Sequence, residues 1–201
     1  MNVEEKRSGP GRPREFDVDR VIADAMEVFQ THGYAGTSLI DLLEGTGLTR
    51  GSLYKAFEDK RTLFLAALAH YTSRNTEALA QCLKADSALT GIRAALLLVA
   101  ADSSLASGER GCLLVSSATE MASKDESVKA IVRGTFDRIQ SLFQEAIGRG
   151  QRTGEISMSH SPADLARFIL CTIEGLGVVG KSRRSRADMT RIVEVAMSAL
   201  A

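Results

Sequence analysis

Hydroxyl and cationic side chains recur between residues 37 and 60 at spacings that suit a phosphate-binding surface. If residues 49–57 form a helix, it presents four polar side chains outward: Arg50, Ser52, Tyr54 and Lys55. Such groups donate hydrogen bonds to the base edges and phosphates of double-stranded DNA. Three more fall at helix ends or edges, where hydroxyls and an ammonium can bind phosphate: Thr37, Ser38 and Lys60. Each residue alone is equally well explained as a surface residue or helix cap, but together they predict DNA binding.

A second candidate for chemistry is the thiol of Cys112, which follows Arg110 and Gly111 at the expected start of a helix. A helix dipole and a neighbouring cation lower the pKa of a thiol, and the resulting thiolate reacts with electrophiles and oxidants. The alternative is that Cys112 is a small buried apolar residue, as cysteine often is. Cys82 and Cys171 lack a charged neighbour pattern and are predicted to lie in the core.

The histidines are scattered at His32, His70 and His160, and none has a metal-ligand partner three or four residues away. The sequence contains no glycine-rich phosphate loop, nucleophile elbow or His-Glu-x-x-His motif. We therefore expect neither an enzyme nor a metal site or bound cofactor.

The elements that position these residues are predicted to be helices, because apolar residues recur with a period of 3.6 and strand patterns are missing. Asp17, Ser38, Thr49 and Asp59 are suitable helix caps, and Gly33 suits a helix end. The expected helices run from Asp17 to about Gly33 and over 38–44, 49–57, 59–84, 88–105, 111–122, 125–149, 162–180 and 187–200. The predicted fold class is all-α.

Composition agrees with a globular protein, since 44% of the 201 residues are hydrophobic and 25 basic residues balance 25 acidic ones. Any DNA binding must therefore use placed cations rather than a general positive field. The cysteines are odd in number and form no Cys-x-x-Cys pair, which argues against disulfides and structural zinc. With no apolar leader and no membrane-spanning stretch, we expect a cytoplasmic protein with no membrane partner.

The expected helices 38–44 and 49–57, joined through Gly45-Thr46-Gly47, form a helix-turn-helix pattern. With the flanking runs Gly33-Tyr34-Ala35-Gly36-Thr37-Ser38 and Asp59-Lys60-Arg61-Thr62-Leu63-Phe64, the segment 12–68 resembles the TetR/AcrR family of bacterial regulators. The resemblance implies a homodimer whose fourth helix connects a DNA-binding domain to a ligand-binding and dimerisation domain. The expected divisions are a flexible basic arm (1–15), the DNA-binding domain (16–62) and the effector-binding and dimerisation domain (63–201).

Carried over residue by residue, the resemblance implies DNA contacts by Thr37, Ser38, Arg50, Gly51, Ser52, Tyr54, Lys55 and Lys60. Gly51 would allow a close approach to DNA. Two positions depart from the family pattern: Leu43 replaces a small alanine, and Ala56 replaces a frequent histidine or aromatic residue. The arm adds Arg12 and Arg14, with Arg7, as candidates for the minor groove, the alternative being a disordered, solvated tail.

In resembling proteins the last two helices meet their copies across a two-fold axis. The apolar positions predicted for this interface are Phe168, Ile169, Ile173, Leu176, Ile192, Val193, Ala196 and Leu200. A dimer would also place two recognition helices about one DNA turn, or a small multiple, apart on a palindromic operator. The alternative is that both helices pack only within the monomer.

The apolar faces of the C-terminal helices suggest candidates for the lining of an effector pocket: Tyr71, Leu98, Cys112, Phe136, Phe143 and Phe168. Each could equally be a core residue. With few aromatics and no evident interior charge, a small or moderately apolar effector is expected. The predicted function is a homodimeric repressor that releases its operator on binding a small effector, which is thiol-reactive if Cys112 acts as a sensor. The alternatives are an activator or a ligand-binding protein with a non-functional DNA head.

Overall fold

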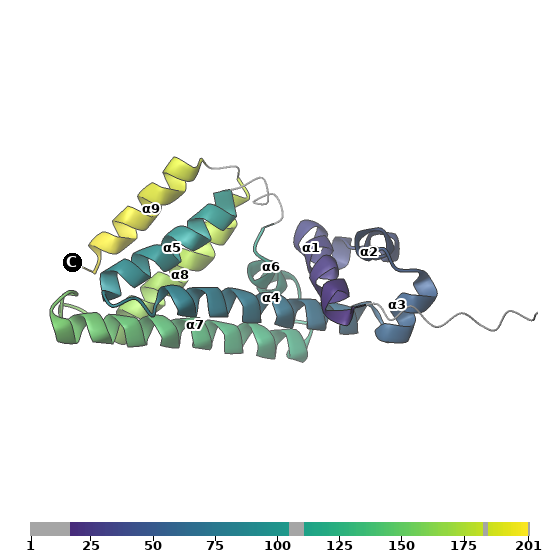
Figure 1. Ribbon diagram of the computed structural model, residues 1–201, viewed down its shortest axis with the longest axis horizontal. Coiled ribbons are helices and arrows are strands. Elements are labelled where there is room, and N and C mark those ends of the chain that lie inside the picture. The colour runs from purple at the N-terminus through teal and green to yellow at the C-terminus, as the bar shows by residue number, and fades with distance from the viewer. Residues whose placement is uncertain (1–16, 105–110, 183–184, 201) are drawn as a thin grey trace, which may run out of the picture.

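The computed structural model describes residues 17–104, 111–182 and 185–200, and within these ranges the chain forms helices and no strand (Figure 1). The helices are α1 (Val18–Gly36), α2 (Leu39–Thr46), α3 (Arg50–Ala56), α4 (Lys60–Cys82), α5 (Ala88–Ser104), α6 (Leu113–Glu120), α7 (Glu126–Thr153), α8 (Pro162–Gly180) and α9 (Arg186–Ser198). The all-α prediction is confirmed. The predicted ends are close to the observed ones, apart from those of the first helix and of α7, which ends four residues later.

The three N-terminal helices form a small head at one end of the molecule (Figure 1). The predicted caps are confirmed, because Asp17, Ser38, Thr49 and Asp59 each accept a hydrogen bond from a backbone N–H in the first turn of the following helix. Gly47 adopts the left-handed conformation, with φ +66°, and ends α2. These local signals set the geometry of the helix-turn-helix.

The first helix does not stop at Gly33 as predicted. Gly33 has φ +70° and ψ 178°, so it kinks the helix, which then continues to Gly36. The backbone N–H groups of Tyr34 and Ala35 are bonded instead to the carboxylate of Glu120, at 3.1 and 2.6 Å. A residue 85 positions away therefore satisfies the amides that the kink releases.

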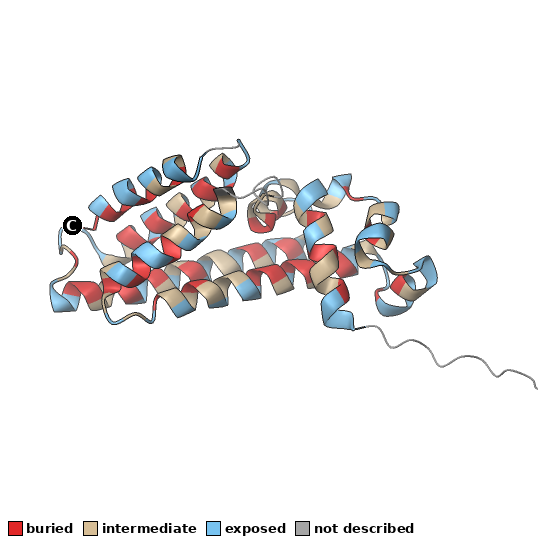
Figure 2. Cartoon of the chain, turned by 45° about the horizontal axis from the view of Figure 1, so that its top comes forward, coloured by how far each residue is buried: buried red, intermediate tan, exposed pale blue. Residues whose placement is uncertain are grey.

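In the body of the protein α4 and α7 pack against each other along the long axis, and α5, α8 and α9 form a further group above them (Figure 1). The buried faces of these helices meet in the interior, while the outer sides are exposed (Figure 2). Phe29 of α1 packs edge-on against Phe64 of α4, with ring centroids 5.0 Å apart, and Tyr34 lies 4.8 Å from Phe64. This aromatic cluster fastens α1 of the head to α4.

An ion pair joins the starts of α4 and α7, next to the head. Arg61 in the first turn of α4 donates from Nε and Nη2 to Asp125, at 2.6 and 2.9 Å, and also from Nη2 to Ser127 Oγ. Asp125 caps α7, and its hydrogen bond with Arg61 lowers the pKa of its carboxyl to about 2. No helix in the described part of the chain is both long and apolar enough to cross a membrane.

Candidate DNA-binding surface and ligand cavity

The helix α3 is anchored by Leu53, which is buried, and presents Arg50, Tyr54 and Lys55 to solvent. The Tyr54 side chain is 43% exposed, and the Arg50 guanidinium lies 5.8 Å from the centre of its ring. Apart from its chain neighbours and the backbone of its own helix, no described atom lies within 4 Å of where a Cβ would stand on Gly51. The exposed side of α3 is therefore cationic, hydrogen-bonding and open, which suits entry into a DNA groove.

The structure places other predicted DNA contacts differently. Thr37 is only 2% exposed, and its hydroxyl donates to the Gly33 carbonyl at 2.6 Å. Its side chain holds the end of α1 and is not presented to a phosphate, contrary to the prediction. Lys60 is half-buried, with Nζ bonded to the Thr37 carbonyl and 4.6 Å from the centre of the Tyr34 ring. Two of its three ammonium donors remain for another partner.

Ser38 and Ser52 lie at the starts of their helices. Ser38 is exposed, its hydroxyl accepts from the Asp41 N–H, and its own N–H donates to the Asp41 carboxylate. Ser52 is half-buried and accepts from the Thr49 hydroxyl at 3.0 Å. Both are at the head surface, where the predicted contacts remain predictions. Arg12 and Arg14 of the arm, with Arg7, lie outside the described residues.

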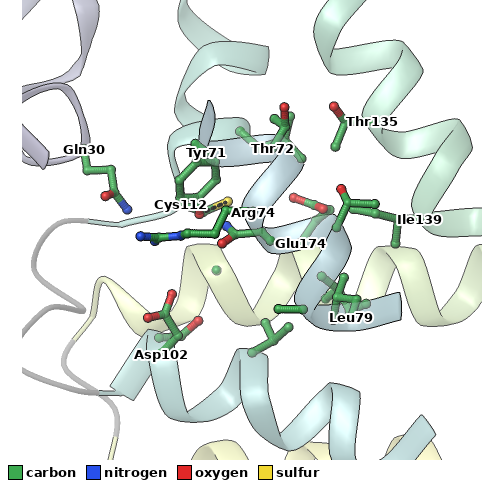
Figure 3. Close-up of a pocket in the computed structure, with 18 of the residues that line it drawn as sticks. Gln30, Tyr71, Thr72, Arg74, Leu79, Asp102, Cys112, Thr135, Ile139 and Glu174 are labelled. Carbon is green, nitrogen blue, oxygen red and sulfur yellow. Dashed lines mark hydrogen bonds between the residues drawn. The ribbon is translucent and has the colours of Figure 1, made fainter. Parts of the chain in front are cut away.

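A cavity of about 260 Å³ lies in the body, between α4 and helices α1, α5, α6, α7 and α8. Tyr71, Leu98 and Cys112 line it as predicted, and Figure 3 shows Tyr71 and Cys112 side by side. The predictions for three other residues were wrong. Phe143 is fully buried in the core, Phe136 packs partly buried against the core, and Phe168 is 44% exposed on α8. Apolar periodicity marks a buried face but not which part of that face meets a cavity.

Cys112 is the N-cap residue of α6, yet its side chain makes no capping hydrogen bond. The Tyr71 hydroxyl donates to its sulfur at 3.5 Å. Burial, with a contribution from the negative charge of Glu174, raises the pKa of the thiol. Of the two interpretations of Cys112, this favours the small apolar residue over the thiol with a lowered pKa. Arg110, the expected second cause of a lowered pKa, lies outside the described residues.

The other two cysteines differ from each other. Cys82 is half-buried and packs against the core, close to the prediction. Cys171 is exposed on α8, so its prediction as a core residue was wrong.

The residue that sequence reasoning missed is Glu174, which lines the cavity from α8. Its Oε2 atom is buried and has no hydrogen-bond partner among the described residues. Burial raises the pKa of this carboxyl to about 7. The expectation of no interior charge was therefore wrong. The available signal was a single acid in an otherwise apolar helix, Phe168-Ile169-Leu170-Cys171-Thr172-Ile173-Glu174-Gly175-Leu176-Gly177-Val178.

The residues predicted to form a dimer interface separate into two sets. Ile169, Ile173, Leu176, Val193, Ala196 and Leu200 are buried within the single chain, so they serve its own core and their assignment to the interface was wrong. Phe168 and Ile192 are exposed. Together with other exposed apolar or small residues, these two lie on the outer faces of the last two helices. The exposed set is Phe168, Cys171, Gly175 and Val178 on α8 and Ile192 and Val195 on α9.

Comparison with known proteins identifies both parts of the chain. Residues 21–67 match the family of bacterial regulatory proteins of the tetR type, and residues 88–196 match the tetracyclin repressor-like C-terminal domain. The chain belongs to the TetR family. It is thus a helix-turn-helix transcriptional regulator and not an enzyme, as the sequence predicted. No group of three or more histidine, cysteine or acidic residues that could hold a metal ion occurs in the described ranges.

Full-length relatives of this TetR family protein include the HTH-type transcriptional repressor ComR of Escherichia coli, which is 29% identical over 94% of this chain and 90% of its own length. A cysteine mutant of the TetR family regulator CifR, solved with 26-bp operator DNA, is 34% identical, with a TM-score of 0.83 over 94% of this chain and all of that chain. Reduced NemR of E. coli, at 19% identity, shares the fold, with a TM-score of 0.79 over 91% of this chain and 97% of its own.

Proposed function

We propose that this protein is a transcriptional repressor that binds a two-fold symmetric operator as a homodimer and releases it when a small molecule occupies the cavity. The proposal rests chiefly on the open cationic surface of α3, in a chain 34% identical to a regulator solved on operator DNA. In this proposal the head (16–62) binds DNA and the remainder (63–201) receives the signal, with α4 crossing the boundary.

The two-fold arrangement is supported by the exposed apolar stripe on α8 and α9. Its members on α8, Phe168, Cys171, Gly175 and Val178, recur at intervals of three and four residues, and Val195 of α9 is 70% exposed. This is the spacing with which helices pack into bundles. A second copy would cover the stripe and place two recognition helices on one side of the DNA.

The signalling route is supported by the position of α6. Its first residue neighbours Cys112 in the cavity wall, and its last, Glu120, holds the backbone of α1 in the head. A ligand that displaces α6 or α4 would therefore tilt the head and change the spacing of the two recognition helices.

A second candidate for the signal is covalent reaction of a thiol-reactive compound with Cys112, because its sulfur lines the cavity. The raised pKa of the thiol keeps the thiolate fraction low at pH 7, which favours non-covalent binding instead. Thiol-specific release of operator that persists in a Cys112→Ser variant would exclude this candidate.

The test of the proposed function is selection of bound duplexes from a random DNA pool by the purified protein at 150 mM salt. Enrichment of an inverted repeat, bound by two chains per duplex, is the expected result. Enrichment of no sequence, with binding no tighter than to random DNA, would contradict the proposal and favour a ligand-binding protein with a non-functional head. Reporter transcription that rises with the protein present would identify an activator.

A further inference from the structure

The burial of the Glu174 carboxyl is not offset by any hydrogen bond to Oε2 among the described residues. Its Oε2 atom is buried, and burial alone accounts for the rise in the pKa of its carboxyl. A buried carboxyl group that lacks a partner destabilises a protein, so such groups are rare away from functional sites. Glu174 lies in the wall of the cavity, where a ligand can supply the missing partner.

The charged and titratable groups around the cavity favour a cation. Arg74 of α4 is the one basic side chain among the described lining residues, and three are acidic: Glu27 of α1, Asp102 of α5 and Glu174. Arg74 and Asp102 are exposed, and thus lie toward solvent rather than beside the buried carboxyl oxygen. The Tyr71 hydroxyl is directed to Cys112 Sγ, so it is not the donor that Glu174 lacks.

The rest of the lining sets the size and polarity of the ligand. Leu79, Leu114, Ile139 and Ile173 form apolar walls, and uncharged polar side chains such as those of Asn75 and Thr135 lie between them. A volume of about 260 Å³ lies at the small end of ligand pockets. These walls suit a compact apolar body, with one polar group directed at α8.

We propose that the effector is a compact organic monocation, an amine whose ammonium donates to the Glu174 carboxylate while its apolar body fills the cavity. This inference rests on the proposed function, because it assigns the chemistry of the ligand that the cavity receives.

The test compares ligands that share one skeleton and differ only in the polar group. Binding of phenethylamine, 2-phenylethanol and phenylacetate is measured by calorimetry, alongside a panel of primary to tertiary amines of similar size. A hydrogen bond between charged groups strengthens binding by about 10- to 100-fold. We expect amines to bind about 10-fold or more tightly than the alcohol, and phenylacetate to bind least.

Two variants locate the interaction. Glu174→Gln keeps the shape but removes the charge, and should weaken amine binding about 10-fold while leaving the alcohol unchanged. Asp102→Asn removes an equal charge at an exposed position of the same cavity, so it controls for the general negative field. It should weaken amine binding less than about 3-fold, because exposed charges are screened by solvent.

The pH dependence gives a second readout. An alkylammonium keeps its proton to a pH of about 10, like lysine. Because the free Glu174 carboxyl has a pKa of about 7, amine affinity should rise between pH 6 and pH 8 in the wild type and stay level in Glu174→Gln. The other acidic and basic groups around the cavity, Glu27, Asp102 and Arg74, are common to both proteins.

Several results would overturn the inference: no binding by any amine of the panel, equal affinity for the alcohol, or equal losses in both variants. An affinity that rises as the pH falls would also overturn the inference, because it would mean that a neutral ligand accepts a hydrogen bond from protonated Glu174. Operator binding is measured separately on the selected duplex. Intact operator binding without amine binding rejects only this inference, whereas amine binding without operator binding rejects only the proposed function.

Discussion

Glu120, the last residue of α6, accepts a hydrogen bond of 2.6 Å from the backbone N–H of Ala35 in α1. The same carboxylate accepts from Tyr34, so one side chain of the body holds the kinked end of the first head helix. The opposite end of α6 lies at the cavity, next to Cys112. One helix of two turns therefore contacts both the candidate ligand site and the head.

Substitution Glu120→Gln should loosen the end of α1. A neutral amide accepts weaker hydrogen bonds than a carboxylate, so the Tyr34 and Ala35 amides should exchange with solvent roughly 3- to 10-fold faster. Hydrogen exchange followed by NMR measures this, with Glu145→Gln, an exposed acid of α7, as the control. Unchanged exchange at both amides would mean that Glu120 does not hold the kink.

Gly33→Ala should lower the free energy of unfolding by more than about 1 kcal/mol. Gly33 has φ +70°, and a Cβ there would lie 3.0 Å from Glu120 Oε2. Gly134→Ala is the matched control, because Gly134 lies inside α7 with open space around it and should gain up to about 1 kcal/mol. Urea unfolding of both variants gives the difference; similar effects of the same sign would contradict the role of the kink.

Arg50→Ala and Lys55→Ala should both weaken operator binding, in different ways. A base contact by Arg50 predicts a loss of about 1–3 kcal/mol that depends on sequence, whereas a phosphate contact by Lys55 lowers the slope of affinity against salt by about one. Fluorescence anisotropy at several salt concentrations separates the two. Arg152→Ala, exposed in the last turn of α7, should change neither quantity.

Val195→Glu should convert the proposed dimer to monomers, because it places a charge on the stripe of α8 and α9. Light scattering at micromolar concentration measures the mass, and operator affinity should fall with it. Met158→Glu alters a side chain that is equally exposed but lies outside both helices, and it should leave the mass unchanged. If Val195→Glu also leaves the mass at its wild-type value, the stripe is not the interface.

Glu174 should make the protein less stable as pH rises. Burial raises the pKa of its carboxyl from 4.5 to about 7, so between these values the folded state binds more protons than the unfolded state. The free energy of unfolding should therefore fall by roughly 2 kcal/mol from pH 4.5 to pH 7.5 because of this group. Glu174→Gln should abolish that part of the slope, while Asp102→Asn retains it; equal slopes in the wild type and Glu174→Gln would show that the carboxyl titrates normally.

The helices of the head could be predicted from the sequence alone, because local interactions determine them. The caps at Ser38, Thr49 and Asp59 and the left-handed Gly47 act within a few residues, so their types and spacing determined the helix-turn-helix. The same holds for the all-α fold class, because amphipathic periodicity is a property of each segment. Tyr54 and Lys55 are exposed for the same reason, since burial of Leu53 turns them outward.

Only the tertiary structure decided which apolar residues meet a cavity, the core or solvent. Phe143 and Phe168 are both apolar residues of long helices, yet one is fully buried and the other exposed, because that depends on where neighbouring helices pack. Burial of Glu174 and the raised pKa of Cys112 likewise come from helices distant in sequence. The hydrogen bond from the Ala35 N–H to Glu120 also depends on the packing of α1 against α6. No pattern within either helix predicts it, because the two residues meet only in the folded protein.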